Sequence, residues 1–502
     1  MALLDGIPCS SAVTSHRPWP RVVVDADGWQ KAIDRLVANE IVLLGLWGDA
    51  DVVHMALACP EGDAIAVISL ECRGGTFPSV GARHAPARRL ERAISDLFGL
   101  EAAGTPDDRP WLDHQRWDCA HPLGKGGRPK QAIPYRFLPS EGEGLHQVAV
   151  GPVHAGIIEP GHFRFAANGE FVVRLEGRLG YVHKGIEALM SGATLDGAAR
   201  LACRTSGDSA VAYSYAFVSA VESALQIEVP ARAVYLRALA AELERLGNHF
   251  GDIGAICNDA SFALMHAQTG ILRERCLRVA ETCFGHRLMM DLILPGGLAR
   301  DLAVDGHAAV TGLLAEIDRA FPRLIELYDK TASLQDRTVG TGVVKPAYAR
   351  LFGAGGYVGR ASGRPLDARR SPGYAPYRDL SFEVPTLQEG DVNARVWIRI
   401  REVEQSVQLI RQILAQLPAG AIRAALPSSG EPAEGLALVE AFRGDVLVWV
   451  RLDEDRRIAR GHLRDASWFQ WPLVEAAIEG NIIADFPLCN KSFNCSYSGH
   501  DL

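Results

Sequence analysis

The first quarter of the chain combines short apolar runs with two helical patterns. A valine-rich run at residues 21–24 and three further β-rich runs have the length of strands. Apolar residues at helical spacing predict one helix over residues 27–40 and a second that ends near Leu100. Together these elements predict a small α/β module over residues 1–125. The three β-rich runs cover residues 41–47, 52–58 and 64–70.

A Gly- and charge-rich stretch at residues 126–146 predicts a linker to a second unit, residues 147–502. Near the start of this unit, Asn168-Gly169 lies between two apolar runs and predicts a β-hairpin. The pattern then becomes largely helical, interrupted by a Gly-, Pro- and Arg-rich segment at 338–391 that predicts irregular loops, and residues 436–452 are β-rich. The candidate helices cover residues 208–226, 231–257, 261–290, 304–334 and 397–417.

The expected fold class is therefore α+β, with a small N-terminal α/β module followed by a helix-rich large domain that has β-structure at its start and near its C-terminus. A length of 502 residues, 48% of them hydrophobic and 22% charged, fits two or three globular domains. The net charge of −8 and the scattered basic residues argue against nucleic-acid binding. None of the 10 cysteines forms a C-x-x-C pair, which argues against zinc ribbons, iron–sulfur ligation and redox dithiols within this chain.

The sequence also predicts the cellular compartment of the chain. Its N-terminus lacks the basic region and apolar run of a signal peptide. No uninterrupted apolar segment reaches the roughly 18–20 residues that span a bilayer. We therefore expect a soluble, cytoplasmic chain that reaches a membrane only through partner subunits.

Two segments that are almost 300 residues apart contain serine and glycine in a motif-like spacing. The tail reads Pro487-Leu-Cys-Asn-Lys-Ser-Phe-Asn-Cys-Ser-Tyr-Ser-Gly-His500, and residues 204–209 read Arg-Thr-Ser-Gly-Asp-Ser. They resemble the motifs Asp-Pro-Cys-x-x-Cys and Arg-x-Cys-Gly-x-Cys, with which nickel-iron hydrogenase large subunits bind nickel. Serine or glycine stands at each ligand position, and neither replaces a soft thiolate at neutral pH. The resemblance therefore implies a hydrogenase-type subunit that binds no metal, with vacated ligand positions at Ser206, Ser209, Ser496 and Gly499.

Further motifs extend the resemblance over essentially the whole chain. Residues 90–100 and His121-Pro-Leu resemble the small hydrophilic, 30 kDa-type subunit of respiratory complex I. Residues 151–164 resemble the opening loop of the large subunits of complex I and of membrane-bound hydrogenases. In those families a loop His helps to bind the quinone headgroup and a nearby Glu passes protons, and these roles fall to His162 and Glu159. A capping or salt-bridge role is the alternative for both.

The chain also departs from complex I. There the segment equivalent to 204–209 presents an Asp-Tyr-x-His cluster, whereas here Gly207 takes the Tyr position and Ser209 the His position. Asp208 stays as a displaced polar group. The resemblance thus implies two sets of candidate site residues. The catalytic candidates are Glu159, His162 and Asp208, and the substrate-binding candidates are Ser206, Gly207, Ser209, Arg360, Asp367 and Arg369.

A structural role competes with substrate binding for part of this set. Alternating Asp and Arg residues over 360–369 are also typical of a buried ion network that locks the fold, because buried charges need partners. The same explanation applies to Glu242 and Arg245, which share a helix face with His249.

The group that the chain resembles best is the group 4, energy-converting hydrogenase-related large subunits that lack the nickel ligands, with a fused N-terminal module as in formate hydrogenlyase. This implies the large subunit of a membrane-associated, complex I-like oxidoreductase that couples electron transfer to ion translocation. It also implies an iron–sulfur small subunit with a [4Fe-4S] cluster and antiporter-like membrane subunits as partners, on the cytoplasmic face of the inner membrane. No cofactor is expected in this chain, although quinone binding, and NAD binding within such complexes, are functions of the family.

Three other functions stay open at this point. The chain can be a non-catalytic scaffold, an atypical nickel-iron hydrogenase of the formate hydrogenlyase type, or a quinone oxidoreductase with a remodelled pocket. A single pocket lined by the catalytic and substrate-binding candidates would favour the last of these. The residues that such a pocket would bring together are His162, Ser206, Asp208, Ser209 and Arg360.

The alignment makes a geometric prediction. Residues 204–209 and 494–499 should face one another, with Ser206 or Ser209 within about 12 Å of Ser496, which is the outer limit for a shared site, and with Glu159 or His162 nearby. Hydrogenase precursors lose a C-terminal extension after nickel insertion. Because this sequence stops near that cleavage point, we expect a tail that folds directly into the core without processing, with its aromatic residues Phe493 and Tyr497 packed.

Overall fold

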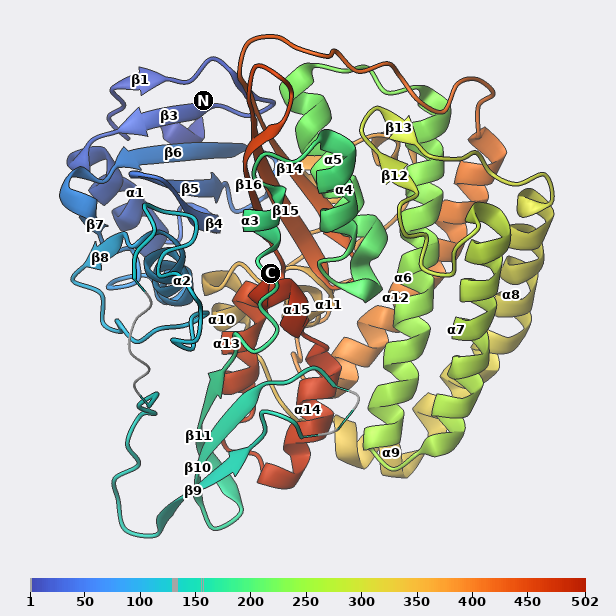
Figure 1. Ribbon diagram of the computed structural model, residues 1–502. Helices are drawn as coiled ribbons and strands as arrows, with labels where there is room; N and C mark the ends of the chain where they lie inside the picture. The colour runs from blue at the N-terminus through green and yellow to red at the C-terminus, as the bar shows by residue number, and fades with distance from the viewer. Residues whose placement is uncertain (1, 129–133, 155, 157) are drawn as a thin grey trace.

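The N-terminal module is built on a mixed five-stranded sheet in the order β1-β3-β6-β5-β4. In the computed structural model, which describes residues 2–128, 134–154, 156 and 158–502, helices α1 (Ala26–Val37) and α2 (Arg88–Phe98) belong to this module (Figure 1). Helix α1 begins where the Asp25 side chain accepts a hydrogen bond from the Gly28 N–H, as its N-cap position predicts. The strands are β1 (Ser11–Ala12), β3 (Arg21–Val24), β4 (Val42–Asp49), β5 (Val52–Ala58) and β6 (Ile65–Glu71), and β7 (Thr76–Pro78) pairs with β8 (Glu101–Ala103).

A second sheet joins the two ends of the chain. Its order is β16-β15-β14-β2, and β2 (His16–Arg17) pairs in parallel with β14 (Ala433–Ala441). Trp47 of the module packs on Trp449, with ring centroids 5.8 Å apart, in an apolar cluster shared by both sheets. The N-terminal module is therefore packed against the C-terminal part of the chain. The other strands are β15 (Gly444–Leu452) and β16 (Ile458–Arg464).

Two buried histidines in this region predict acid sensitivity. Burial lowers the pKa of both His16 and His54 from 6.5 to about 4. As the pH falls from 6.5 to 4, the unfolded chain therefore takes up protons that the folded chain does not, and stability is lost over that window. For His54 we expect a loss of about 2 kcal/mol between pH 7 and pH 5. Urea unfolding of the wild type and of His54→Gln at both pH values measures it, and an equal pH dependence in the two proteins would contradict the prediction.

The predicted hairpin at Asn168-Gly169 is confirmed. It joins β10 (His162–Asn168) to β11 (Phe171–Arg178), and β9 (Leu145–Val150) adds to the other edge of β10. The opening loop, residues 151–161, connects β9 to β10, so it leaves and re-enters the same end of this sheet.

The large domain is dominated by long helices that lie side by side on the far side of the molecule from the module (Figure 1). Helix α5 (Ala210–Leu225) packs against β14 and β15, and its apolar surface all round follows from burial between that sheet and the bundle. The five long helices predicted from the sequence are confirmed, although the end of α7 and the start of α12 differ from the predicted positions by six and five residues. Residues 304–334 split into α8 and α9. The bundle helices are α6 (Ala231–Asp259), α7 (Ala263–Phe284), α8 (Gly306–Lys330), α9 (Ala332–Thr338) and α12 (Val392–Gln416).

The structure contains short elements that the sequence pattern did not predict. Helices α10 and α11 lie within the segment expected to be irregular, where Gly and Pro obscure their periodicity. Helix α13 carries an internal proline, Pro472. These elements are α3 (Ile186–Met190), α4 (Leu195–Cys203), β12 (Ile293–Leu294), β13 (Gly297–Leu298), α10 (Pro346–Leu351), α11 (Gly356–Ala361), α13 (Ser467–Ala477), α14 (Phe486–Phe493) and α15 (Tyr497–Asp501), together with short 3-10 or π turns at Ala2–Leu4, Arg73–Gly75, Ala85–Ala87, Gly207–Ser209, Arg369–Gly373, Tyr377–Asp379 and Ile483–Asp485.

The observed fold mixes helices and strands as the expected α+β class requires, with a sheet-containing N-terminal module and a helix-rich remainder. The boundaries at residues 125 and 146 stay predictions. In the part of the chain that the structure describes, no helix has both the length and the apolar character to cross a bilayer.

Candidate functional site

The two segments that resemble nickel-binding motifs meet in the fold, as predicted. The hydroxyl oxygens of Ser206 and Ser496 lie 3.0 Å apart, at hydrogen-bond distance. Ser206, Ser209, Ser496 and Gly499 are all buried. The predicted packing of the tail is also found, since Phe493 and Tyr497 are buried. The alignment of these segments is therefore supported by their proximity in space.

Local structure explains how each segment presents its side chains. Residues 207–209 form a single 3-10 turn between α4 and α5, so Ser206 and Ser209 flank the start of a buried helix. In the tail, α14 is followed by Asn494, which adopts a left-handed conformation with φ of 43°. The chain can then turn so that Ser496 caps α15 by accepting a hydrogen bond from the Gly499 N–H.

An ion pair lies beside these serines. The Arg443 guanidinium is 2.6 Å from one carboxylate oxygen of Asp208, and the other oxygen accepts hydrogen bonds from Ser206 at 2.7 Å and Ser209 at 3.1 Å. Burial opposes ionisation of Asp208, but the Arg443 charge and these hydrogen bonds outweigh it and hold the pKa of Asp208 below its usual value. The site thus contains the fixed guanidinium cation of Arg443 and oxygen atoms, which are hard donors.

The position of the fourth ligand, Gly499, has no room for a side chain. A Cβ atom there would lie 2.6 Å from a carboxylate oxygen of Asp465 and 2.8 Å from the Tyr213 hydroxyl. These two groups are hydrogen-bonded to each other at 2.6 Å, and both are buried. The Tyr213–Asp465 pair therefore occupies the space into which a cysteine at 499 would project.

Two cysteines lie in the tail itself. Burial raises the pKa of Cys489 to about 11 and that of Cys495 further still. Both therefore remain neutral thiols at neutral pH, and a neutral thiol is a poor metal ligand. Among the described residues, no cluster of three or more His, Cys, Asp or Glu side chains has the arrangement to hold a metal ion. The residues present do not fit a nickel-iron centre.

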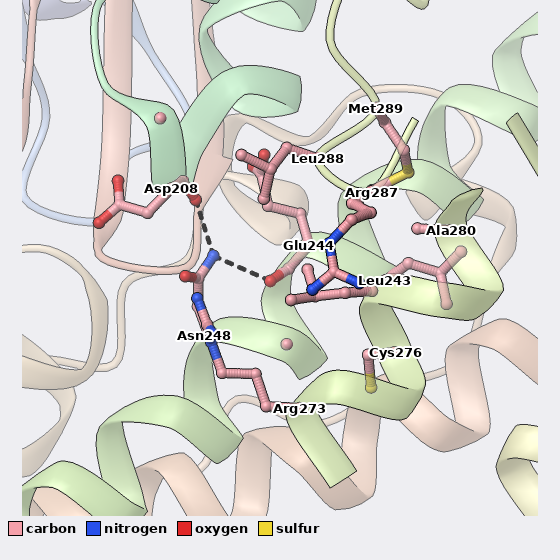
Figure 2. Close-up of a pocket in the computed structure, with 13 residues that line it drawn as sticks. Asp208, Leu243, Glu244, Asn248, Arg273, Cys276, Ala280, Arg287, Leu288 and Met289 are labelled. Carbon is pink, nitrogen blue, oxygen red and sulfur yellow. Dashed lines mark hydrogen bonds between the residues drawn. The ribbon is translucent and has the colours of Figure 1, made fainter. Parts of the chain in front are cut away.

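A cavity of about 140 Å³ opens next to Asp208, between α6, α7 and the loop after α7 (Figure 2). Asn248 bridges its wall by donating to the backbone oxygens of Asp208 at 2.7 Å and Glu244 at 2.9 Å. The Glu244 carboxylate accepts hydrogen bonds from the N–H groups of Val211 and Ala212 at the start of α5. Burial raises the pKa of Glu244 to about 8, although these hydrogen bonds oppose the rise.

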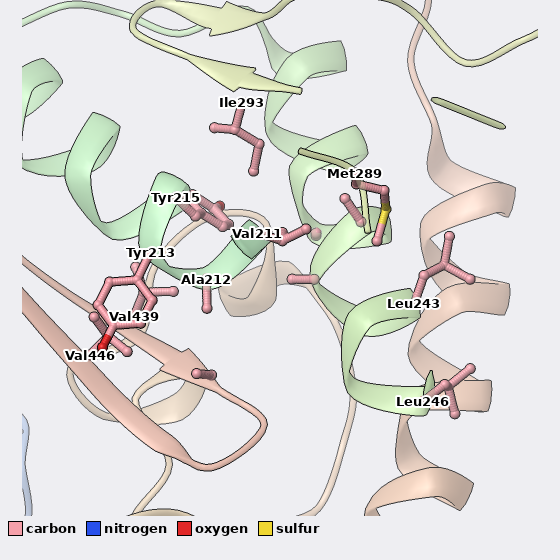
Figure 3. Close-up of a cluster of buried hydrophobic side chains, with 14 of the residues drawn as sticks. Val211, Ala212, Tyr213, Tyr215, Leu243, Leu246, Met289, Ile293, Val439 and Val446 are labelled. Carbon is pink, nitrogen blue, oxygen red and sulfur yellow. The ribbon is translucent and has the colours of Figure 1, made fainter. Parts of the chain in front are cut away.

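Glu244 is a site residue that the sequence alone did not indicate. It belongs to the run Glu242-Leu-Glu-Arg, in which Glu242 and Arg245 already account for the charged helix face. The missing signal is tertiary, because only the packing of α5 on α6 brings its carboxylate to a helix N-terminus. Figure 3 shows the apolar side chains around this packing, including Val211, Leu243 and Met289.

The opening-loop candidates separate in the structure. The Glu159 carboxylate accepts a hydrogen bond from the Ser498 N–H at 3.0 Å, which places it beside the paired segments as predicted. His162 instead lines a different cavity of about 830 Å³, between the module and the hairpin sheet, and its ring lies tilted against Phe137 with the centroids 4.9 Å apart. Burial lowers the pKa of His162, so its ring is neutral at pH 7.

The remaining substrate-binding candidates form a buried ion network. Arg360 donates to Glu402 at 2.8 Å and to Glu440 at 2.9 Å, and Arg369 pairs with Asp367 at 2.7 Å. Arg360, Asp367 and Arg369 are at most 2% exposed. The network also includes Glu242, which accepts from Arg369 at 2.9 Å. Such mutual pairing is what the fold-locking alternative requires, while a role in substrate binding stays a prediction.

No single described cavity unites the five residues expected around a remodelled pocket. Gly207 and Asp208 line the smaller cavity, His162 lines the larger one, and Arg360 lies in the ion network. These cavities therefore do not meet the condition that would favour a remodelled quinone pocket shared by all five residues. The physical reason is the Arg443–Asp208 pair and the buried serines, which fill the space between the paired segments.

Comparisons with known proteins identify the family of the chain. Residues 23–130 match the family of the respiratory-chain NADH dehydrogenase 30 Kd subunit, and residues 263–435 match that of the 49 Kd subunit. The chain is 32% identical over 445 residues to formate hydrogenlyase subunit 5 of Escherichia coli (strain K12), which covers 86% of this chain and 78% of that protein. It is 31% identical over 347 residues to one subunit of the NADH-quinone oxidoreductase of Dehalococcoides mccartyi, covering 67% of this chain and 92% of that protein.

A comparison with solved structures also finds a subunit of a respiratory membrane complex. One chain in the structure of the membrane-bound sulfane sulfur reductase, an archaeal respiratory membrane complex, superposes with a TM-score of 0.68 and 26% identity, over 72% of this chain and 99% of that one. The chain therefore belongs to the superfamily of hydrogenase and complex I-type large subunits. Within that superfamily it carries a 30 Kd-type module fused to a 49 Kd-type domain, and it is similar over most of its length to the formate hydrogenlyase and hydrogenase-4 proteins.

Proposed function

We propose that this chain is the large subunit of a membrane-associated, complex I-like oxidoreductase that works without a nickel-iron centre. The observation that supports the proposal is that other side chains occupy the positions equivalent to the nickel ligands. Hydroxyl groups replace thiolates at three positions, and the Tyr213–Asp465 pair takes the space of a fourth side chain at Gly499. Oxygen donors beside a fixed guanidinium favour neither nickel nor any other soft cation.

The partners follow from the family. Its members with similar sequence are subunits of hydrogenase and NADH-quinone oxidoreductase complexes, and the superposed chain comes from a respiratory membrane complex. The proposed assembly therefore contains an iron–sulfur small subunit with a [4Fe-4S] cluster and antiporter-like membrane subunits that move ions. In this arrangement our chain is peripheral, on the cytoplasmic face of the membrane.

A quinone is the proposed electron acceptor, and the larger cavity is its candidate site. A volume of about 830 Å³ is suited to a small organic molecule, and the aromatic rings of Tyr135, Phe137 and Tyr181 line the walls. His162 is only 9% exposed there, and its Nε2 atom has no hydrogen-bond partner among the described residues. Because Nδ1 of the neutral ring donates to the Gly151 carbonyl oxygen, Nε2 has a free lone pair, and the hydroxyl group of a bound quinol would donate to it.

A scaffold that only couples neighbouring subunits is the second candidate. The observation in its favour is the burial of Arg360, Asp367 and Arg369 in mutual ion pairs, away from either cavity. An assay of quinone reduction by the purified complex separates the two functions. Quinone reduction that is lost in His162→Ala supports the acceptor site, whereas an intact complex without quinone reduction supports the scaffold.

We expect the purified complex to contain no stoichiometric nickel in this subunit and to show no hydrogen uptake. The reason is the absence of thiolates at positions 206, 209, 496 and 499. Elemental analysis and a hydrogen-uptake assay test this directly. Nickel near one equivalent, removed by a chelator together with activity, would overturn the proposal.

A further inference from the structure

The smaller cavity, between α6, α7 and the loop after α7, has a chemistry that the proposed function does not use. Two arginines line it, Arg273 from α7 and Arg287 from the following loop (Figure 2). Its volume of about 140 Å³ equals the space that about five water molecules occupy. The cavity is therefore large enough for a small ion. Much of the remaining wall is apolar and consists of Leu243, Cys276, Leu277, Ala280, Leu288 and Met289.

Arg273 is a cation without a counter-charge. Its side chain makes no hydrogen bond or ion pair within the part of the chain that the structure describes. The side chain nevertheless packs closely against α6, because it lies over Gly251, where an added Cβ would be 2.9 Å from the Arg273 Cδ and 3.1 Å from its Nε. Glycine at 251 thus makes room for the arginine. The guanidinium lies beside the cavity with its N–H donors unused.

The other charged groups of the cavity already have partners. Arg287 donates to both carboxylate oxygens of Glu274, at 3.0 and 2.7 Å, and its other N–H groups stay available for a further acceptor. Asp208 has its own arginine partner at 2.6 Å. The Glu244 carboxylate accepts two backbone N–H groups at the start of α5, where the helix dipole favours a negative group. The positive charge of Arg273 therefore remains uncompensated by any described residue.

We propose that this cavity binds one small inorganic oxoanion, of tetrahedral or trigonal shape, between Arg273 and Arg287. Guanidinium groups bind oxoanions through paired N–H···O hydrogen bonds, which are stronger than those between neutral groups. The apolar wall strengthens this attraction, because it lowers the local dielectric constant. The bound ion would contact Gly207 and Asp208, at the edge of the paired segments. This site goes beyond the proposed function, and its occupation does not depend on which molecule accepts electrons.

Isothermal titration calorimetry of the intact purified complex with sodium selenate tests the proposal. Sodium gluconate, whose anion is too large for the cavity, keeps the ionic strength constant. We expect one selenate per copy of this chain. Arg273→Met should weaken binding at least about tenfold, because it removes a charged hydrogen-bond donor. Arg275→Met is the matched control, since Arg275 is 52% exposed on the same helix and does not line the cavity. Absent binding, or equal affinity in the wild type and Arg273→Met, overturns the proposal.

A second variant makes the cavity smaller and leaves its charge unchanged. Gly247 of α6 lines the cavity, and an added Cβ there would lie 3.8 Å from the Cys276 Cβ, so alanine fits without a clash. Because alanine favours a helix more than glycine does, we expect Gly247→Ala to unfold at no lower temperature than the wild type. Crowding of the ion should weaken selenate binding at least about fivefold. Unchanged selenate affinity in this variant would place the ion outside the cavity and overturn the site.

Discussion

Replacing Gly499 with alanine should be among the most damaging single changes in the chain. The added Cβ would lie 2.6 Å from Asp465 and 2.8 Å from the Tyr213 hydroxyl, both held in a buried hydrogen bond. Overpacking and loss of that hydrogen bond together should lower the free energy of unfolding by about 3–5 kcal/mol. Chemical denaturation of the purified variant measures the loss.

Gly207→Ala is the matched control for this experiment. Gly207 lies in the same site, yet a Cβ built on it would meet no atom within 4 Å. Its stability should stay close to that of the wild type. If both alanine variants were equally stable, the Tyr213–Asp465 pair would not fill the site as described. By the same reasoning, restoring cysteine at all four ligand positions should not create a nickel site unless Tyr213 and Asp465 are also replaced.

The second large effect concerns the buried ion network. Arg360→Met should lower the free energy of unfolding by about 3–5 kcal/mol, because it leaves carboxylates buried without their cation. Arg360 is fully buried and contacts Glu402, Glu440 and Asp367. Urea or thermal unfolding is the measurement.

An exposed ion pair provides the comparison. Arg278→Met removes one of the two arginine partners of Glu274 on the outer surface of α7, where solvent screens the charges. We expect little change in stability there. Similar losses in the two variants would mean that general loss of positive charge, rather than burial of unpaired carboxylates, explains the effect at Arg360.

The sequence predicted more of the fold than of the site. The long helices and the hairpin follow from local periodicity and from Asn168-Gly169, so they were found correctly. Helices α10 and α11 were missed because Gly and Pro interrupt their pattern. For the same reason α13, with Pro472 inside it, has no clear amphipathic signature.

At the site, the sequence revealed which ligands are missing but not what replaces them. The serines at 206 and 496 could be paired from motif spacing, and their 3.0 Å contact confirms that pairing. Asp465 and Arg443, by contrast, come from a strand end and a turn that carry no motif. Their roles depend on tertiary contacts with residues far away in sequence. Of the two loop residues of which one was expected near the serines, Glu159 lies beside them, whereas β10 directs His162 to the other cavity.

The pairing of β2 with β14 has a consequence for how the protein is made. Residues 16–17 leave the ribosome early, whereas their partners at Glu434 and Gly435 are synthesised more than four hundred residues later. Such a contact has a very high sequence separation, which slows folding. During synthesis β2 therefore stays unpaired until β14 is made, and unpaired strands promote aggregation. A chaperone that shields this strand until the C-terminal sheet emerges would therefore raise the yield of folded protein.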